Sequence, residues 1–412
     1  MEPRRETELG ELPASWRVGP LGEFLSKTQY GASVKGTSSG GQPILRMTNQ
    51  VNGRISSANL QYAEVPARDL ENFRVQRGDI LFNRTNSFEL VGRTAIFDLD
   101  GDYLFASYLI RLQTLKAVLD PFFLNAYLNA HETQRRLKGI ATRAVSQSNI
   151  SASRLRTFVV PVPPLDEQRK IAMILDVVQR AIEHQDRLLA LTMELKKALL
   201  QKLFTQGLRS EPQRQTEIGP IPSNWKVVTI GELFKFSSGK SRPTDTEPTT
   251  SESKPFPVFG GNGVLGYSGV FLLEEPVLLL GRVGEYCGCV HHTEGRAWVS
   301  DNALYAKEIS DAIDSHYATE YFTHANMNQY SSRAGQPLIT QGTISRVKMP
   351  LPSVDEQKMI LEPLQLLNDK MKQHRAKHAR LRALFRTLLH HLMTAQIRVN
   401  YLNLSDLYQE AI

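Results

Sequence analysis

Two stretches of the chain, 166–208 and 355–397, carry the same pattern, and each opens on Asp-Glu-Gln after a proline-rich approach. In the second stretch, apolar residues recur in alternating steps of four and three. This spacing is typical of a long helix that presents a narrow apolar seam to a partner helix, as in a coiled coil. We therefore expect two long helices, each the partner of the other. The predicted seam of the second helix is Ile360, Leu364, Leu367, Met371, His374, His378, Leu381, Phe385, Leu388 and Leu392.

The first stretch gives an equivalent seam in which polar residues replace some of the apolar ones. Its members are Ile171, Leu175, Val178, Ile182, Gln185, Leu189, Thr192, Lys196, Leu199 and Leu203. Polar seam residues usually set the register of a helix pair at some cost in stability. We expect this role for Gln185, Thr192 and Lys196. The same role is favoured for His374 and His378, with a metal-binding pair as the alternative.

Local signals mark the ends of both predicted helices. Gly207 predicts the end of the first helix, because glycine readily adopts the left-handed conformation that closes a helix. Ser353 and Glu356 form a capping-box pattern at the start of the second. Pro363 lies inside the second pattern and predicts a kink or a break near Leu361.

A second repeat precedes each long stretch. Residues 7–25 (TELGELPASWRVGPLGEFL) match 216–234 (TEIGPIPSNWKVVTIGELF), with Trp16 in the place of Trp225. An internal repeat of this length sets the architecture. The predicted order along the chain is therefore a first unit, a long helix, a related second unit and a second long helix. The predicted fold class is α+β, with two related α/β units alternating with two long helices.

Both units show the same order of elements. Short apolar runs bounded by glycine, proline and asparagine predict strands, and one helical pattern follows the strands in each unit. In the first unit the strands are at 43–47, 78–82, 94–99 and 105–112, the helix is at 120–139 and a last strand is at 157–163. In the second unit the strands are PFPVFG, VLLLG, GCVHH and ALYA, the helix is at 311–330 and the last strand is RVKMPLP.

Length and composition limit the classes of protein. A chain of 412 residues is expected to form two or three domains. Its net charge of +7 is compatible with a nucleic-acid partner. The two cysteines provide no disulfide framework. The charged amino terminus does not resemble a signal peptide, and no apolar run is long enough for a membrane span. We therefore expect a cytoplasmic protein with no membrane partner.

Two glycine motifs suggest nucleotide binding but lack the context that it needs. The glycines of 261–266 fit G-x-G-x-x-G, but Gly269 and Pro276 follow closely and leave no room for a helix at the third glycine. We favour a turn between strands. Residues 239–241 end like a phosphate-binding loop, yet Phe234 stands where that loop needs its first glycine.

The cluster Cys287-x-Cys289-x-His291-His292 could supply metal ligands. A structural zinc site usually takes two separated pairs of ligands, so small buried thiols beside a strand are the favoured interpretation. No metal site is predicted. We find no nucleophile elbow and no methyltransferase tetrapeptide, so no catalytic residue is predicted and the chain is not expected to be an enzyme.

Polar and basic residues gather on loops at corresponding places in both units, as expected of side chains that reach phosphates and base edges. The candidate DNA contacts in the first unit are Lys27, Gln29, Lys35, Arg46, Asn49, Asn83, Arg84, Asn86, Arg143, Gln147 and Asn149. Those in the second unit are Lys240, Arg242, Asn262, Arg282, Arg333, Gln336 and Gln341.

These motifs together resemble a known family. The repeated entry around Trp16 and Trp225, the segment GDILFNRTNSFELVGRTAIF (78–97), the segment FPVFGGNGVLGYSG (256–269) and the two P-x-P-x-x-DEQ helix entries carry the resemblance. They are similar to the specificity subunit of type I restriction–modification systems. The resemblance covers nearly the whole chain and includes its duplicated order.

The resemblance implies a fold and a domain order. It implies two target-recognition domains and two long helices that pack as an antiparallel coiled coil with a pseudo-two-fold. The implied domains are target-recognition domain 1 at 1–163, a long spacer helix at 164–209, target-recognition domain 2 at 210–352, a second long spacer helix at 353–397 and a tail at 398–412. Each recognition domain would read one half of a split, asymmetric target in double-stranded DNA, and the helices would act as a ruler.

The resemblance also implies partners. Two modification (methyltransferase) subunits and motor–nuclease restriction subunits would bind the chain. These partners, not this chain, would hold S-adenosylmethionine, ATP and Mg²⁺. Two other functions stay open from the residues alone. One is a non-catalytic scaffold of two protein-binding modules on a coiled coil, and the other is a stand-alone methyltransferase or nuclease.

Overall fold

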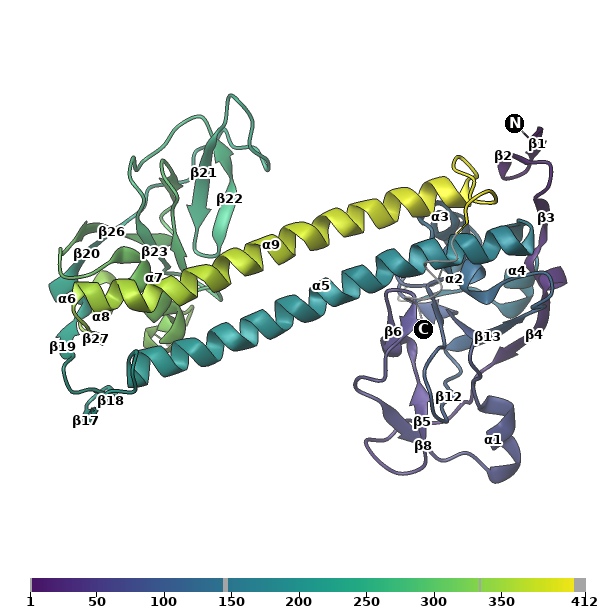
Figure 1. The fold of residues 1–412 in the computed structure, drawn as a ribbon, viewed down its shortest axis with the longest axis horizontal. Helices are drawn as coiled ribbons and strands as arrows, with labels where there is room; N and C mark the ends of the chain where they lie inside the picture. The colour runs from purple at the N-terminus through teal and green to yellow at the C-terminus, as the bar shows by residue number, and fades with distance from the viewer. Residues whose placement is uncertain (1, 144–146, 333–334, 404–412) are drawn as a thin grey trace. The chain divides into compact units, whose positions relative to one another are not determined.

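The computed structural model describes residues 2–143, 147–332 and 335–403. It divides into two compact units, Met1–Gln185 with Lys377–Ile412 (unit 1) and Asp186–Ala376 (unit 2). The two predicted long helices are present as α5 (Leu165–Gln206) and α9 (Val354–Met393), drawn in teal and yellow in Figure 1. Each unit thus contains one half of each long helix. The predicted fold class, two related α/β units alternating with two long helices, is confirmed.

Unit 1 is built on a six-stranded sheet in which only β11 and β7 run parallel. The sheet order is β4 (Leu25–Tyr30), β13 (Leu109–Thr114), β9 (Ile80–Asn83), β11 (Thr94–Ile96), β7 (Arg54–Ile55) and β6 (Gln50–Val51). A second sheet contains β12 (Leu104–Phe105), β5 (Gln42–Leu45) and β8 (Gln61–Ala63), and a third contains β10 (Thr85–Asn86), β15 (Ser148–Asn149) and β14 (Thr142–Arg143). Two-stranded pairs join β1 (Arg4–Thr7) to β2 (Gly10–Pro13) and β3 (Arg17–Pro20) to β16 (Val159–Val162).

Helices cover this sheet and link it to the long helices. They are η1 (Leu21–Phe24), η2 (Met47–Asn49), α1 (Ala67–Phe73), α2 (Pro121–Asn129), α3 (His131–Gly139) and α4 (Ala152–Arg156). The helix predicted at 120–139 is therefore two helices, with Ala130 in extended conformation between them. In the main core of unit 1, Ile171 and Leu175 from α5 are buried together with Leu389 and Leu392 from α9.

Unit 2 repeats this plan with fewer strands. Its four-stranded sheet is β20 (Phe234–Ser238), β26 (Ala303–Ile309), β23 (Leu278–Gly281) and β24 (Val290–His292). A second sheet is β22 (Gly263–Ser268), β21 (Phe256–Gly260) and β25 (Trp298–Val299), and pairs join β17 (Gln213–Thr216) to β18 (Gly219–Pro222) and β19 (Lys226–Thr229) to β27 (Lys348–Leu351). The helices are α6 (Ile230–Leu233), α7 (Ser315–His324), η3 (Met327–Tyr330) and α8 (Gln341–Ser345).

The opposite halves of the long helices meet in the core of unit 2. There Leu200 and Leu203 from the end of α5 are buried with Ile360 and Leu364 from the start of α9. Unit 1 combines the start of α5 with the end of α9 in the same way. This exchange of halves is what antiparallel pairing of two helices requires.

The repeated tryptophan and the Asp-Glu-Gln opening have one structural explanation. Trp16 is buried, and its indole Nε1 donates a hydrogen bond to Glu167 Oε2 at 3.1 Å. Trp225 Nε1 donates to Glu356 Oε1 at 2.8 Å in the same way. A buried indole N–H needs an acceptor, so each tryptophan fixes the start of its long helix against the first strands of its unit.

The glutamine of the same tripeptide makes a second repeated contact. Gln168 Oε1 accepts the backbone N–H of Asp120 at 2.8 Å, and Gln357 Oε1 accepts that of Asp314 at 2.8 Å. Asp120 and Asp314 cap the N-termini of α2 and α7 with their side chains. Both glutamines are fully buried, so each orients the helix that covers its sheet.

Each predicted seam residue lies on the less exposed side of its helix. In the middle of α9, between 370 and 382, the residues that are not exposed are Met371, His374, His378 and Leu381. Gly207 follows α5 with φ of 70°, which confirms it as the end of that helix. Among the described residues, no helix is long and apolar enough to cross a membrane.

Two expectations for α9 need correction. The helix runs without a break through Pro363, because Leu361 and Leu364 on either side are buried in the core of unit 2. That packing outweighs the backbone hydrogen bond that proline removes. The capping box is also only half formed. Ser353 Oγ accepts the backbone N–H of Glu356 at 3.3 Å, but the Glu356 carboxylate binds Trp225 instead.

Candidate nucleic-acid interface

In unit 1, the candidate residues meet at the end of β9. Arg84 directly follows that strand, and its guanidinium carbon lies 4.6 Å from the centre of the Tyr30 ring. The guanidinium makes one long hydrogen bond, from Nη1 to the Ser107 carbonyl oxygen at 3.5 Å. Its buried Nε has no hydrogen-bond partner among the described residues. Stacking on an aromatic ring thus fixes this cation at the end of β9.

The small sheet β10–β15–β14 continues this surface. Asn149 Nδ2 donates to Thr85 Oγ1 at 2.7 Å, which joins the two loops that carry the candidates. Asn86 Nδ2 contacts Met47 Sδ at 3.0 Å. The exposed Arg143 stacks on a phenylalanine ring, 3.8 Å from its centre. The structure therefore brings Arg84, Asn86, Arg143 and Asn149 together, with exposed Gln147 at the edge of β15.

Three other candidates of unit 1 stay predictions that their burial or their hydrogen bonds within the fold do not favour. Asn49 is buried, and its amide bonds the carbonyl oxygens of Ser56 and Ala58. Asn83 is buried within β9. Gln29 donates to the Asn72 carbonyl oxygen at 2.9 Å and accepts from Arg111.

The remaining candidates of unit 1 are accessible to different degrees. Lys27 and Lys35 are exposed. Arg46 is half-buried, and its Nη2 donates to the Asn59 carbonyl oxygen at 3.2 Å. The two lysines could reach phosphates, since an exposed lysine is a mobile point charge. Arg46 is less available, because part of its guanidinium already bonds a neighbouring loop.

In unit 2, the candidates gather at the end of β23. Arg282 directly follows the strand, and its Nη1 donates to Ser238 Oγ at 2.9 Å. Its buried Nε has no hydrogen-bond partner in the described part of the chain. Asn262 lies exposed in the turn between β21 and β22. The neighbouring Gly261 carbonyl oxygen lies so close to Gly281 that a Cβ atom on Gly281 would be only 2.3 Å from it. That close approach holds the turn against the residue before Arg282.

The other candidates of unit 2 lie on the flanking loops. Lys240 is exposed two residues after β20, and Gln336 is exposed beside Pro337, whose carbonyl accepts the Gly284 N–H at 2.9 Å. Exposed Arg242 donates to Thr246 Oγ1 at 2.7 Å. Gln341 is exposed at the first residue of α8. Arg333 lies outside the described residues.

Three exposed tyrosines at these surfaces were missed by the sequence analysis. Tyr30 and Tyr108 flank Arg84 in unit 1, and Tyr286 lies four residues after Arg282 in unit 2. Exposed aromatic rings beside arginines can stack on bases. An aromatic residue within a polar loop was the available signal, but in the sequence it looks the same as an aromatic residue of a strand.

Two members of the predicted metal-ligand cluster, Cys287 and His292, make contacts within unit 2. Cys287 is buried, burial raises the pKa of its thiol, and its Sγ lies 3.2 Å from the Arg282 carbonyl oxygen. His292 Nε2 is 3.0 Å from Ser315 Oγ. The described residues contain no group of three or more histidine, cysteine or acidic side chains that could hold a metal ion.

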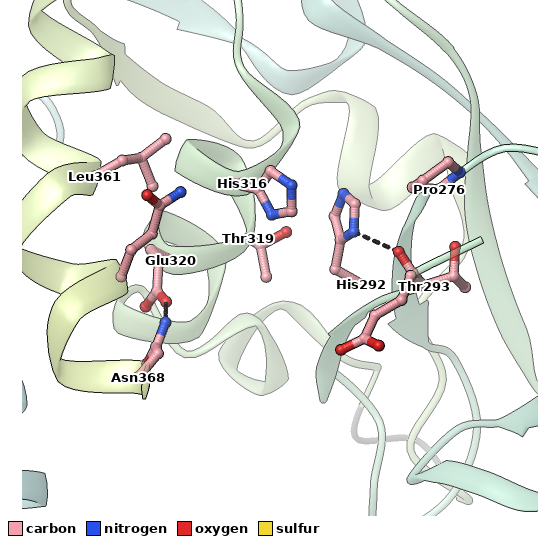
Figure 2. Close-up of a pocket in the computed structure, with 10 residues that line it drawn as sticks. Pro276, His292, Thr293, His316, Thr319, Glu320, Leu361 and Asn368 are labelled. Atoms are coloured by element: carbon pink, nitrogen blue, oxygen red, sulfur yellow. Dashed lines mark hydrogen bonds between the residues drawn. The ribbon is translucent and has the colours of Figure 1, made fainter. Parts of the chain in front are cut away.

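A pocket of about 470 Å³ opens in unit 2 near α7 and the start of α9, as Figure 2 shows. His292 and His316 stack within it with ring centres 4.1 Å apart. Burial, and then the neighbouring His316, lower the pKa of His292. Asn368 of α9 and Glu320 of α7 also line the pocket, and Asn368 donates to Glu320 at 2.8 Å. None of the candidate DNA contacts lines this pocket.

Comparison with known proteins gives a consistent result. The family model for the type I restriction modification DNA specificity domain matches residues 13–192 and 222–383. A Methanocaldococcus jannaschii protein named as the type I restriction enzyme MjaX specificity subunit is 29% identical, over 96% of each chain. The type I restriction enzyme EcoKI specificity subunit of Escherichia coli is 25% identical, over 46% of this chain and 42% of its own.

Solved structures support the same fold. The S subunit of the type I restriction-modification system from M. genitalium superposes with a TM-score of 0.67 at 18% identity, covering 92% of this chain and 96% of that one. A chain from a structure of the assembly and conformational transition of the type I R-M system superposes with a TM-score of 0.53 at 17% identity, covering 94% and 99%.

Proposed function

Because the chain belongs to the type I restriction–modification DNA specificity family, we propose that unit 1 and unit 2 each read one half of a split, asymmetric DNA target. The chain is the DNA-specificity subunit of a type I complex, and methylation and cleavage belong to other subunits of that complex. The observation that carries the proposal is the pair of polar surfaces around Arg84 and Arg282. They occupy the same place in two related units but are built from different loops.

The difference between the loops predicts an asymmetric target. A homodimer presents one surface twice and matches a palindrome. Here one surface includes the β10–β15–β14 sheet, and the other includes the turn between β21 and β22. Two surfaces of unlike chemistry should select two unlike half-sites, one for each unit.

The long helices support binding of two copies of one partner. Val177 on α5 and Leu366 on α9 occupy the same position of the helix repeat, and both are exposed. Leu195 and Leu384 form a second such pair. Exposed apolar residues that recur in both repeats are suited to docking two identical subunits. We assign these subunits as the two modification subunits.

Further partners and cofactors complete the proposal. Restriction subunits would join the modification subunits and DNA in the full complex. S-adenosylmethionine, ATP and Mg²⁺ would be held by these partners. The proposed location is the cytoplasm, together with the DNA partner.

The length of the helices is proposed to set the unread spacer between the half-sites. Deleting 186–192 from α5 and 375–381 from α9 removes one heptad from each helix and keeps the seam in register. The deletion shortens each helix by roughly 10 Å at about 1.5 Å per residue. The selected spacer should shorten by about three base pairs, at about 3.4 Å each, while both half-sequences stay the same.

The spacer is measured by selection from random duplexes with the assembled methyltransferase. Single-helix deletions are the control, because they put the two seams out of register and should prevent assembly. An unchanged spacer with altered half-sequences would show that the helices do not act as a ruler.

A further inference from the structure

Arg84 and Arg282 occupy equivalent positions in the two units, although the surrounding sequences do not align well enough to show it. Each follows the strand that pairs with the long central strand of its sheet, β9 with β13 and β23 with β26. The backbone N–H of Arg84 donates to the Tyr108 carbonyl oxygen at 3.0 Å, and that of Arg282 donates to the Asn302 carbonyl oxygen at 3.0 Å. Tyr108 and Asn302 each precede the paired residue of the central strand.

The next contact is also repeated. The Arg84 carbonyl oxygen accepts the N–H of Ile150 at 2.9 Å, and the Arg282 carbonyl oxygen accepts the N–H of Ile339 at 2.8 Å. Both isoleucines are fully buried and come just before a short helix, α4 or α8. The hydrogen-bond pattern therefore places the two arginines at one site of a common frame.

The side chains share the same unfilled bonding capacity. Both arginines are half-buried, and the Nε of each is buried without a hydrogen-bond partner among the described residues. The support differs, since Arg84 stacks on Tyr30 and Arg282 bonds Ser238. Tyr30 and Ser238 themselves occupy one position, because they pair with Ile110 and Leu304 of the equivalent central strands. Each unit thus uses its own residue to hold the same cation.

A glutamine accompanies each arginine. Gln147 and Gln336 each lie three residues before the isoleucine that bonds the arginine carbonyl, and both are exposed. The repeated pair is therefore an arginine with its guanidinium fork and an exposed glutamine at an equivalent place in the loop that bonds the arginine backbone. An immobilised fork is better suited to the flat edge of a base than to a phosphate, which a mobile cation can grip equally well.

We propose that Arg84 and Arg282 read the same base, a guanine, at the same position of the two half-sites, counted from the methylated base of each. The guanidinium fork would donate to guanine O6 and N7 in the major groove. The proposal rests on the proposed function, because it requires one half-site for each unit. It predicts that two otherwise unlike half-sites share this one base.

The test is selection of methylated duplexes from a random pool, with the wild-type complex and with single variants. Arg84→Lys keeps the charge but loses the fork, so it should lower the preference for guanine at one position of one half-site by about 10- to 100-fold. Arg282→Lys should do the same in the other half-site only. Arg68→Ala on α1 and Arg346→Ala next to α8 are matched controls. Both residues are exposed, and neither variant should change a selected base.

The possible results separate this inference from the proposed function. Two half-sites with a shared guanine, each lost in the corresponding lysine variant, would support the inference. Two half-sites without a shared base would overturn it and leave the proposed function intact. An equal loss of affinity on all sequences in Arg84→Ala, with a shallower salt dependence, would identify a phosphate contact and also overturn it. No enriched sequence with the assembled wild-type complex would overturn both.

Discussion

The start of α5 in unit 1 and the start of α9 in unit 2 are held by the same tryptophan–glutamate bond but by different neighbours. In unit 1, Glu167 is buried and also accepts two hydrogen bonds from Arg398, at 2.6 and 2.9 Å. In unit 2, Glu356 is half-buried, and its second donor is the exposed Asn224 at 3.4 Å. The tryptophan–glutamate hydrogen bond is thus repeated in both units, but the other donors to the glutamate differ.

The difference between the two units lies in Arg398. This residue lies in the segment after α9, and it also binds Glu2 at 2.5 Å. Hydrogen bonds from Ser15 and Arg398 lower the pKa of Glu2 to about 2. Arg398 thus joins the start of α5 to residues from both other parts of unit 1.

The segments between the repeated ends of the two units share a core and differ around it. Both keep the antiparallel centre of the main sheet, the tryptophan and the buried glutamine. Unit 1 adds α1, the β6–β7 pair and the β10–β15–β14 sheet, whereas unit 2 has the longer β21–β22 hairpin. The shared residues are those that contact a long helix, and the residues that differ surround the two arginines.

The largest expected effect is at the two glutamates. Glu167→Ala leaves a buried indole N–H and the largely buried Arg398 without their acceptor, and should destabilise unit 1 by about 3 kcal/mol. Glu356→Ala removes the acceptor of the buried Trp225 indole N–H and should cost unit 2 about 1–2 kcal/mol. Hydrogen exchange of the β3–β16 and β19–β27 pairs measures each unit separately. Equal losses of stability in the two variants would show that the Glu167–Arg398 ion pair does not stabilise unit 1.

A smaller loss of stability is expected from breaking the Lys196–Glu320 ion pair, which holds α5 in unit 2. Lys196 Nζ lies 2.8 Å from Glu320 Oε2 and 2.7 Å from Asn368 Oδ1, and both charged side chains are largely buried. Lys196→Met leaves the Glu320 carboxylate without its cation and should cost unit 2 about 2 kcal/mol. Adding Glu320→Gln should recover part of the loss, because the amide carries no charge to desolvate.

Unit 1 serves as the internal reference for this change. It holds α5 through Arg54, which contacts Asp98 and Asp176, and Lys196→Met leaves these residues untouched. Exchange protection in unit 1 should therefore stay at its wild-type level. A similar loss in both units would mean that the two do not open independently.

The smallest expected difference is in the response to acid. Burial lowers the pKa of His291, His292 and His324, all in unit 2. A lowered pKa means that the folded state favours the neutral ring, so its stabilising contribution is complete above about pH 6.5 and is lost as the pH falls below that value. The urea midpoint of unit 2 should therefore decrease between pH 7 and pH 5.

Tryptophan fluorescence can follow this response in a Trp16→Phe chain, which leaves Trp225 and Trp298 as reporters in unit 2. Replacing His292 by Asn is the control, because it removes one titrating ring. The pH dependence should then be shallower. An unchanged pH dependence in this variant would exclude His292 as a contributor.

The sequence was sufficient to predict the features that depend on local pattern. Steps of three and four place the seam residues, and the glycine at 207 ends α5 as expected. The matching of Trp16 with Trp225 marks the repeat, and the structure supplies its reason in the two glutamates. The break that Pro363 could cause does not occur, because its cost is local, whereas the packing of Leu361 and Leu364 is tertiary.

The site was less predictable, because polar residues on loops can point inward. Asn49, Asn83 and Gln29 have the composition of DNA contacts, but Asn49 and Asn83 are buried, and Gln29 bonds Asn72 and Arg111. The sequence places Arg84 and Arg282 in corresponding loops, but the segments between the repeated ends differ in length. The backbone hydrogen bonds show that the two residues share one position.

The most direct test of the account is the target of the wild-type complex. The chain is purified with its modification subunit, and protected duplexes are selected from a random pool. The account predicts two short, unlike motifs at one fixed spacing, and exchanging the middle of unit 1 for that of a relative should change one motif only. A palindrome, or a single uninterrupted motif, would contradict the assignment of one half-site to each unit.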